Sequence, residues 1–144
     1  MERVTRRTPA LSLKEVFSRA VASLPEEDER GGVVAEALEY LQQGFESHYG
    51  ADEGASDDDV LVGDNAYAWA VETIARLDEP EFVAVASRMI RDGAGEISSG
   101  GEVSLEFWTP HLAELLRIIS GEDVERSCER VRVAAREVAD EGRA

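Results

Sequence analysis

Apolar side chains recur along most of the chain at intervals of three and four residues, the spacing that places them on one face of an α-helix. Ser, Thr, Asp or Pro residues precede several of these stretches, and glycine-containing segments separate them, as is typical of helix starts and ends. The pattern predicts six helices, over residues 12–24, 26–47, 57–77, 80–97, 109–119 and 122–141. Because the connections are short, we expect an all-α fold: a single-domain helical bundle of about six helices, mostly antiparallel.

Two of these regions leave alternatives open. Pro25 and the acidic residues after it favour an early start for the second helix, whereas the Gly31-Gly32 pair favours a later one. Thr109 and Pro110 are typical of the first turn of the fifth helix. Val103 to Phe107 is short enough to be a strand or the buried approach to that helix, and we favour the approach.

The domain organisation follows from length and from the ends of the chain. A chain of 144 residues is close to the size of one domain. Residues 1–10 carry three arginines, and their apolar residues do not recur at helical spacing, so they predict a flexible basic tail. We expect a single helical domain over 11–141, a surface loop over 48–56, and a frayed C-terminus over 142–144.

Charge narrows the possible partners. The formal net charge is −16 at pH 7, which disfavours binding to nucleic acids or to anionic membranes. No apolar run reaches the roughly 20 residues of a membrane-spanning helix, and the N-terminus lacks the pattern of a signal peptide. The sequence therefore predicts a cytoplasmic protein with no membrane span.

Acidic residues near the middle of the chain are the first candidates for chemistry. Asp57, Asp58 and Asp59 are adjacent, so their side chains diverge on a helix, and the start of a solvated helix explains them better than a Mg²⁺ site. Asp64 lies in the most apolar helix, on the face of Tyr67 and Val71, which predicts a buried carboxylate with a polar partner. That helix is apolar on every side, so we expect it to be central in the bundle.

The remaining candidates favour structural roles. His48 in the loop and His111 in a first helical turn have no second metal ligand within sequence reach, and Cys128 occupies a packed seam. Trp69, Trp108 and Tyr67 are expected in the core, because no basic groove accompanies them. We therefore predict no catalytic residue, no metal site and no cofactor.

One stretch, Val60 to Ile97, resembles part of the all-helical trans-polyprenyl diphosphate synthases. The resemblance rests on an L-x-G-D core at residues 61–64, a break of the type L-x-D/E-P at residues 77–80, and the Gly95-Glu96 pair. It covers about a quarter of the chain, and the order and spacing of the three elements agree with the family.

The departures from that family define what the resemblance implies. Catalytic members use two DDxxD motifs to hold Mg²⁺ and the allylic diphosphate, and this sequence has neither, so we do not expect catalysis by the chain alone. The chain is more similar to the non-catalytic small subunit of heterodimeric heptaprenyl-type synthases. The resemblance implies a subunit that pairs with a catalytic chain, shapes its product length and contributes to menaquinone side-chain synthesis. Contacts in helix packing or with the partner are then expected from Gly63, Asp64, Tyr67, Ala68 and Val71.

Two other functions stay open at the level of sequence. The chain is also compatible with a small homo-oligomeric regulatory module, or with one that binds an apolar ligand between helices. A third hypothesis is a Mg²⁺-dependent phosphohydrolase that uses Glu36, Glu39 and Glu46, although Glu46 lies too far along the helix to complete the set.

Overall fold

The computed structural model describes residues 11–49 and 56–143, and in these residues it contains six α-helices and no strand. The predicted basic tail, most of the predicted loop and the last residue lie outside the described residues. The helices are α1 (Leu13–Ala22), α2 (Arg30–Tyr49), α3 (Asp57–Ala75), α4 (Pro80–Ser98), α5 (Leu105–Ser120) and α6 (Val124–Arg143). The predicted all-α class is therefore confirmed.

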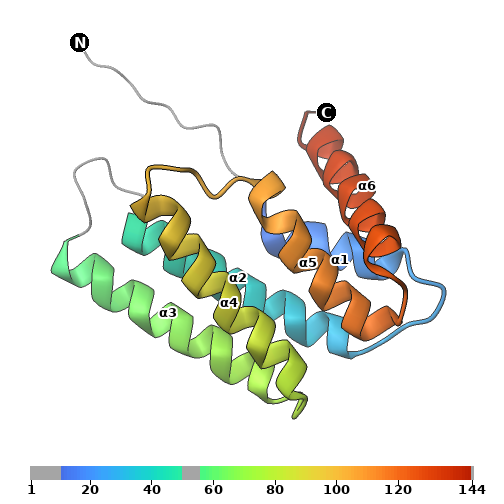
Figure 1. The fold of residues 1–144 in the computed structure, drawn as a ribbon, viewed down its shortest axis with the longest axis horizontal. Coiled ribbons are helices and arrows are strands. Elements are labelled where there is room, and N and C mark those ends of the chain that lie inside the picture. The colour runs from blue at the N-terminus through green and yellow to red at the C-terminus, as the bar shows by residue number, and fades with distance from the viewer. Residues whose placement is uncertain (1–10, 50–55, 144) are drawn as a thin grey trace.

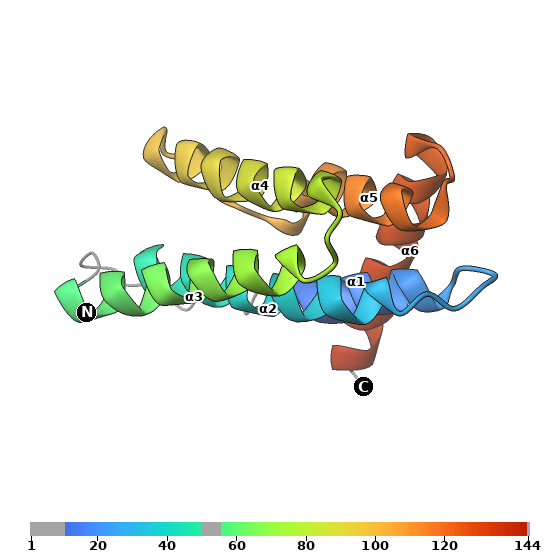
Figure 2. The same cartoon turned by 90° about the horizontal axis from the view of Figure 1, so that it is seen from below.

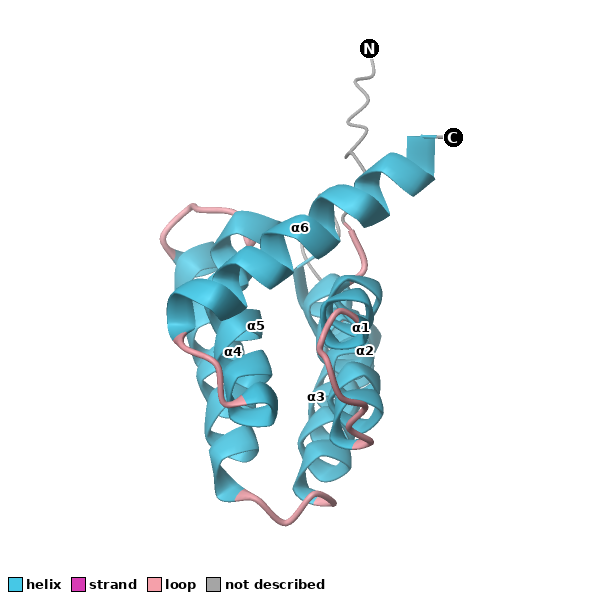
Figure 3. Cartoon of the chain, turned by 90° about the vertical axis from the view of Figure 1, so that its right-hand side faces the viewer, coloured by secondary structure: helices cyan, strands magenta, loops and turns pink. Residues whose placement is uncertain are grey.

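The helices form two layers that share one core (Figure 1). Figure 2 shows α1, α2 and α3 in one row and α4 and α5 in a second row above it. Helix α6 crosses the open end of both rows and packs on α1 and α5 (Figure 3). Large, fully buried side chains fill the space between the layers, among them Phe17, Leu41, Phe82, Met89, Leu112 and Leu116.

Several helices begin where side-chain capping predicts. The hydroxyl of Ser12 accepts a hydrogen bond from the Glu15 backbone N–H at 3.1 Å, as expected for the start of α1. Helix α2 starts late, at Arg30, because the Asp28 carboxylate accepts hydrogen bonds from both the backbone and the guanidinium of that arginine. The expected early start at Pro25 is therefore wrong.

Helix α5 starts earlier than predicted. Ser104 caps its first turn by accepting from the Phe107 backbone N–H at 3.2 Å, and Pro110 lies inside the helix. The expected start at Thr109 is wrong: α5 begins one turn earlier, and both Trp108 and Thr109 are buried within it. Val103 to Phe107 is not a strand, and the favoured alternative holds only for Val103 and Ser104, because Leu105 to Phe107 already belong to the helix. The helix ends at Gly121, whose φ of 77° suits glycine.

Three further predictions need correction. His48 belongs to the last turn of α2 and not to a loop, and His111 lies beyond the first turn of α5. Glu79 occupies the N-cap position of α4. Helix α3 is not central: it packs on α2 and α4 at one edge of its layer, and part of its apolar surface faces solvent (Figure 2).

Candidate partner-binding face

Helix α3 is held in place by its own first turn and by a close crossing with α2. Ser56 and Asp59 form a capping box, each side chain accepting from the backbone N–H of the other at 3.1–3.2 Å. Asp57 and Asp58 are exposed in the same turn, near the positive end of the helix dipole. This geometry supports the solvated helix start over a cation site for the three aspartates.

Glycines on both helices allow the crossing. A Cβ atom at Gly63 would overlap the His48 ring and lie 3.1 Å from the carbonyl oxygen of Gly44, so the two backbones approach closely here. A Cβ atom at Gly44 would overlap the Tyr67 ring. Tyr67 in turn makes an edge contact with Phe45, with ring centroids 5.4 Å apart. Gly63 and Tyr67 therefore serve packing within the chain.

Asp64 is not buried, contrary to expectation. Its side chain is 61% exposed, and its Oδ1 lies 3.0 Å from Nε2 of His48 on α2. The pair spans the α2–α3 crossing, so the predicted polar partner exists and is a histidine. The error arises because glycine at position 63 draws α2 against one side of α3 and leaves the adjacent position at the rim.

The outward side of α3 is apolar. Leu61 is 61% exposed, Val62 56% and Trp69 49%, and Ala68 is also exposed. Leu61 and Val62 lie about two helical turns before Ala68 and Trp69 on the same side of α3, with exposed Asn65 between the two pairs, and we call this surface the α3 face. The face continues onto α2, because the Trp69 ring stacks on the Tyr40 ring with 6.2 Å between the ring centroids. The expectation that Trp69 is a core residue is wrong, whereas Trp108 is buried as predicted.

The other predicted members of this region divide between core and face. Ala68 lies on the exposed face and Val71 is half-buried. Ala66 and Ala70 are buried against neighbouring helices. Sequence reasoning missed Leu61, Val62 and Trp69 as surface residues; their spacing along one face of a helix was the available signal.

Two histidine–aspartate pairs each join neighbouring helices. His111 Nε2 lies 3.1 Å from Asp92 Oδ2 and links α5 to α4, while Nδ1 of the same ring is buried without a hydrogen-bond partner. The hydrogen bond from His111, together with Arg91, lowers the pKa of Asp92 below its usual value. With one nitrogen paired and the other buried, the ring has no free nitrogen for a substrate, so we assign the pair a structural role.

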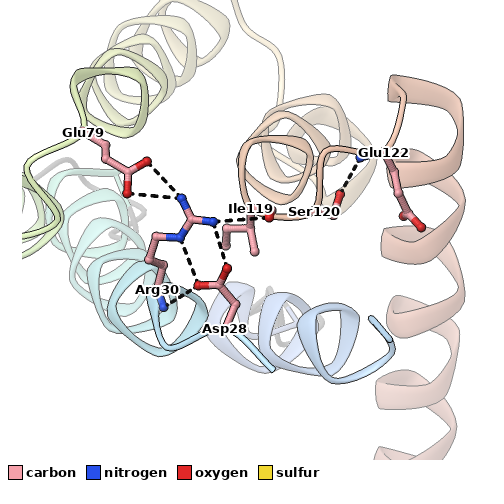
Figure 4. A network of polar contacts seen from close by, with 6 residues as sticks. All are labelled: Asp28, Arg30, Glu79, Ile119, Ser120 and Glu122. Carbon is pink, nitrogen blue, oxygen red and sulfur yellow. Dashed lines mark hydrogen bonds and ion pairs between the residues drawn. The ribbon is translucent and has the colours of Figure 1, made fainter. Parts of the chain in front are cut away.

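An arginine network fixes the loops at the other end of the two layers (Figure 4). The Arg30 guanidinium bonds Asp28, Glu79 and the carbonyl oxygen of Ile119, at distances between 2.8 and 3.3 Å. It thereby joins the starts of α2 and α4 to the end of α5. The hydrogen bond from Arg30 lowers the pKa of Asp28, and the carboxylates raise the pKa of Arg30. Beside this network, the Ser120 hydroxyl accepts from the Glu122 backbone N–H at 3.0 Å.

The acidic residues that the structure describes do not assemble a metal site. In residues 11–49 and 56–143, no group of three His, Cys, Asp or Glu side chains comes together as potential ligands. Glu39 of the phosphohydrolase hypothesis pairs with Lys14 at 3.1 Å. Cys128 is half-buried against the core, in line with its predicted packing role.

A groove of about 220 Å³ lies between α1 and α6, and two of the arginines that line it are paired with carboxylates. Arg19 bonds Glu137 and Glu141, and Arg130 bonds both carboxylate oxygens of Glu122. The two guanidinium charges are therefore compensated within the chain. Val133 and Ala134 supply an apolar part of the lining, and the ligand-binding alternative stays a prediction.

Comparison of the chain with protein-family models, with curated proteins and with solved structures found no match. Fold and surface define the class as a helical bundle with an exposed apolar helix face at one edge. Among the described helices, none combines the length and the apolar character needed to cross a bilayer.

Proposed function

We propose that this protein is a non-catalytic helical subunit that joins another protein through the α3 face. The observation that carries the proposal is the exposure of Leu61, Val62 and Trp69 on a well-anchored helix. Large apolar side chains clustered on one surface are typical of protein-interaction sites, and aromatic residues are enriched among the residues that dominate binding energy.

The partner we propose is a catalytic trans-polyprenyl diphosphate synthase chain. This choice rests on the resemblance of Val60 to Ile97, the stretch that contains the whole α3 face. The chain itself lacks both DDxxD motifs, so the metal-dependent chemistry would belong to the partner. A rigid helical surface would act on product length by stabilising one shape of the partner's product cavity.

Co-expression tests the proposal. The chain is produced together with each catalytic trans-polyprenyl diphosphate synthase chain of its source organism, and complexes are isolated by size-exclusion chromatography. Product chain length is then measured for each synthase with and without this chain. We expect a stable complex with one synthase and a shift in its product length or yield. Absence of a complex with every synthase would contradict the choice of partner.

The homo-oligomeric alternative predicts that the isolated chain assembles with itself. Sedimentation of the isolated chain as a stable dimer or larger assembly, with no synthase bound, would favour it. Because every copy carries a charge of −16, we expect a monomer when the chain is alone.

A further inference from the structure

The α3 face lies within a stretch of sequence whose charged residues are all acidic. Residues 31–75 contain no Lys or Arg, and their acidic residues are Glu36, Glu39, Glu46, Asp52, Glu53, Asp57, Asp58, Asp59, Asp64 and Glu72. Arginines pair with acids elsewhere, at the start of α2 and on α1, α5 and α6. Among the described residues, Glu39 of this stretch pairs with Lys14, and the surface around α2 and α3 is otherwise acidic without a Lys or Arg partner.

The acids stand at the rim of the apolar surface. Asp58 is exposed one turn before Leu61 and Val62, and Glu72 is exposed one turn after Ala68 and Trp69. Asp64 flanks the middle of the face and is mostly exposed despite its contact with His48. An apolar centre with a charged rim is the usual anatomy of a protein interface, and the sign of the rim selects the partner.

A second copy of this chain fits this surface poorly. A symmetric dimer through α3 would bring the same rim carboxylates of both copies together, and like charges across an interface are unfavourable. An anionic membrane surface would be repelled in the same way.

The shape of the face favours a helix as the occupant. From Leu61 to Trp69 the face runs along about 12 Å of helix axis, and its ridge of side chains suits packing against the side chains of another helix. An extended peptide usually docks by adding a strand to a sheet, and the described residues contain no sheet edge.

We propose that the α3 face binds an amphipathic helix of the partner whose apolar stripe is flanked by Lys or Arg. The proposal rests on the proposed function in one respect, namely that the α3 face is a docking surface. The identity of the partner as a prenyl synthase does not enter it.

Synthetic helical peptides test the charge and the pattern separately. The first peptide has 18 residues with leucines at helical spacing and lysines on the flanks. The second has the same leucine stripe with glutamates on the flanks, and the third is a scrambled version of the first without helical spacing. Binding to the full chain is measured by titration calorimetry and by the emission shift of half-exposed Trp69 at 0.15 M NaCl.

We expect the basic amphipathic peptide to bind at least about tenfold more tightly than either of the others. Val62→Ser is expected to weaken this binding about fivefold, and Glu72→Gln about twofold. Val124→Ser and Glu125→Gln are the matched controls, since both residues are exposed on α6, which does not contact α3 among the described helices. The controls are expected to leave binding unchanged, and circular dichroism checks that each variant folds.

Other outcomes overturn the proposal in distinguishable ways. Equal binding of all three peptides, or binding that Val62→Ser and Val124→Ser weaken equally, would exclude a specific basic-helix site on α3. Self-association that only Val62→Ser weakens would assign the face to a second copy. If no peptide binds but a synthase complex forms and Val62→Ser weakens it, the docking function stands and the basic-helix chemistry is wrong. If the basic peptide binds as expected and no synthase does, this proposal stands and the choice of partner fails.

Discussion

At the scale of single residues, Arg30 shows how one side chain sets the boundaries of several elements. Its guanidinium bonds groups that precede α2, begin α4 and end α5, and it lies over the Phe82 ring at 5.8 Å from the centroid. The local acidic run after Pro25 suggested a helix start, whereas its member Asp28 instead bonds Arg30.

The Asp28–Arg30 pair predicts a dependence of stability on pH. Since the hydrogen bond from Arg30 lowers the pKa of Asp28, the carboxylate stabilises the fold above its unfolded pKa. This contribution is lost as the pH falls through the lower, folded value. We expect Asp28→Asn to reduce the free energy of unfolding by about 1 kcal/mol near pH 7, a value that allows for partial solvent exposure.

Urea denaturation of both proteins between pH 7 and pH 2.5 measures this effect. The difference between them should stay constant down to about pH 5 and shrink below about pH 4, as Asp28 becomes protonated in the wild type. Subtracting one protein from the other removes the effect of the remaining carboxylates. A difference that does not change with pH would show that charge on Asp28 contributes nothing.

At the scale of elements, small residues decide how closely the helices approach. Gly93 and Gly95 lie two residues apart on α4 and differ in what surrounds them. The structure separates the two: a Cβ atom at Gly93 would overlap the rings of Phe45 and Trp108, while a Cβ atom at Gly95 meets nothing within 4 Å. Gly93 therefore makes room for an aromatic cluster and not for another backbone.

The two glycines form a matched pair within one helix. Gly93→Ala is expected to destabilise the protein by about 1–3 kcal/mol, because buried rings would have to shift. Gly95→Ala is expected to stabilise it by about 0.5–1 kcal/mol, because alanine favours a helix interior. Thermal unfolding followed by circular dichroism measures both variants. Equal effects of the two substitutions would contradict the packing described around Gly93.

The elements also show how far the sequence predicts the fold and the site. The helical spacing of apolar residues and the capping residues correctly predicted the all-α class, the number of helices in the described residues and the cap at Ser12. They misplaced Asp64 and Trp69, because the apolar content of α3 does not reveal which side a neighbour covers. That information comes from the close approach at Gly44 and Gly63, which joins residues from two different helices.

At the scale of the whole molecule, charge is the dominant surface property. The net charge of −16 acts against the compact state through repulsion among the carboxylates. Dissolved salt screens this repulsion, with a Debye length that falls from about 10 Å at 0.1 M to about 3 Å at 1 M. Salt also screens the exposed ion pairs, but each of these pairs contributes little to the free energy of unfolding.

Stability is therefore expected to increase with salt. Raising KCl from 0.02 M to 1 M should raise the midpoint of thermal unfolding by about 4 °C or more, a shift of about 1 kcal/mol for a chain of this size. Differential scanning calorimetry over a KCl series measures it. A midpoint that stays constant or falls would mean that favourable ion pairs outweigh the general repulsion.

The proposed function depends most on the α3 face, because this is the surface that would bind the partner. The most direct test is the dissociation constant of the complex with the catalytic synthase chain, measured by titration calorimetry for Val62→Ser and for Val124→Ser. The two valines are similarly exposed, at 56% and 51%, and lie on helices that do not contact each other. We predict about fivefold weaker binding for Val62→Ser, from the loss of about 1 kcal/mol of apolar burial, and wild-type affinity for Val124→Ser. Equal dissociation constants for the two variants, or no complex with the wild-type chain, would contradict the account.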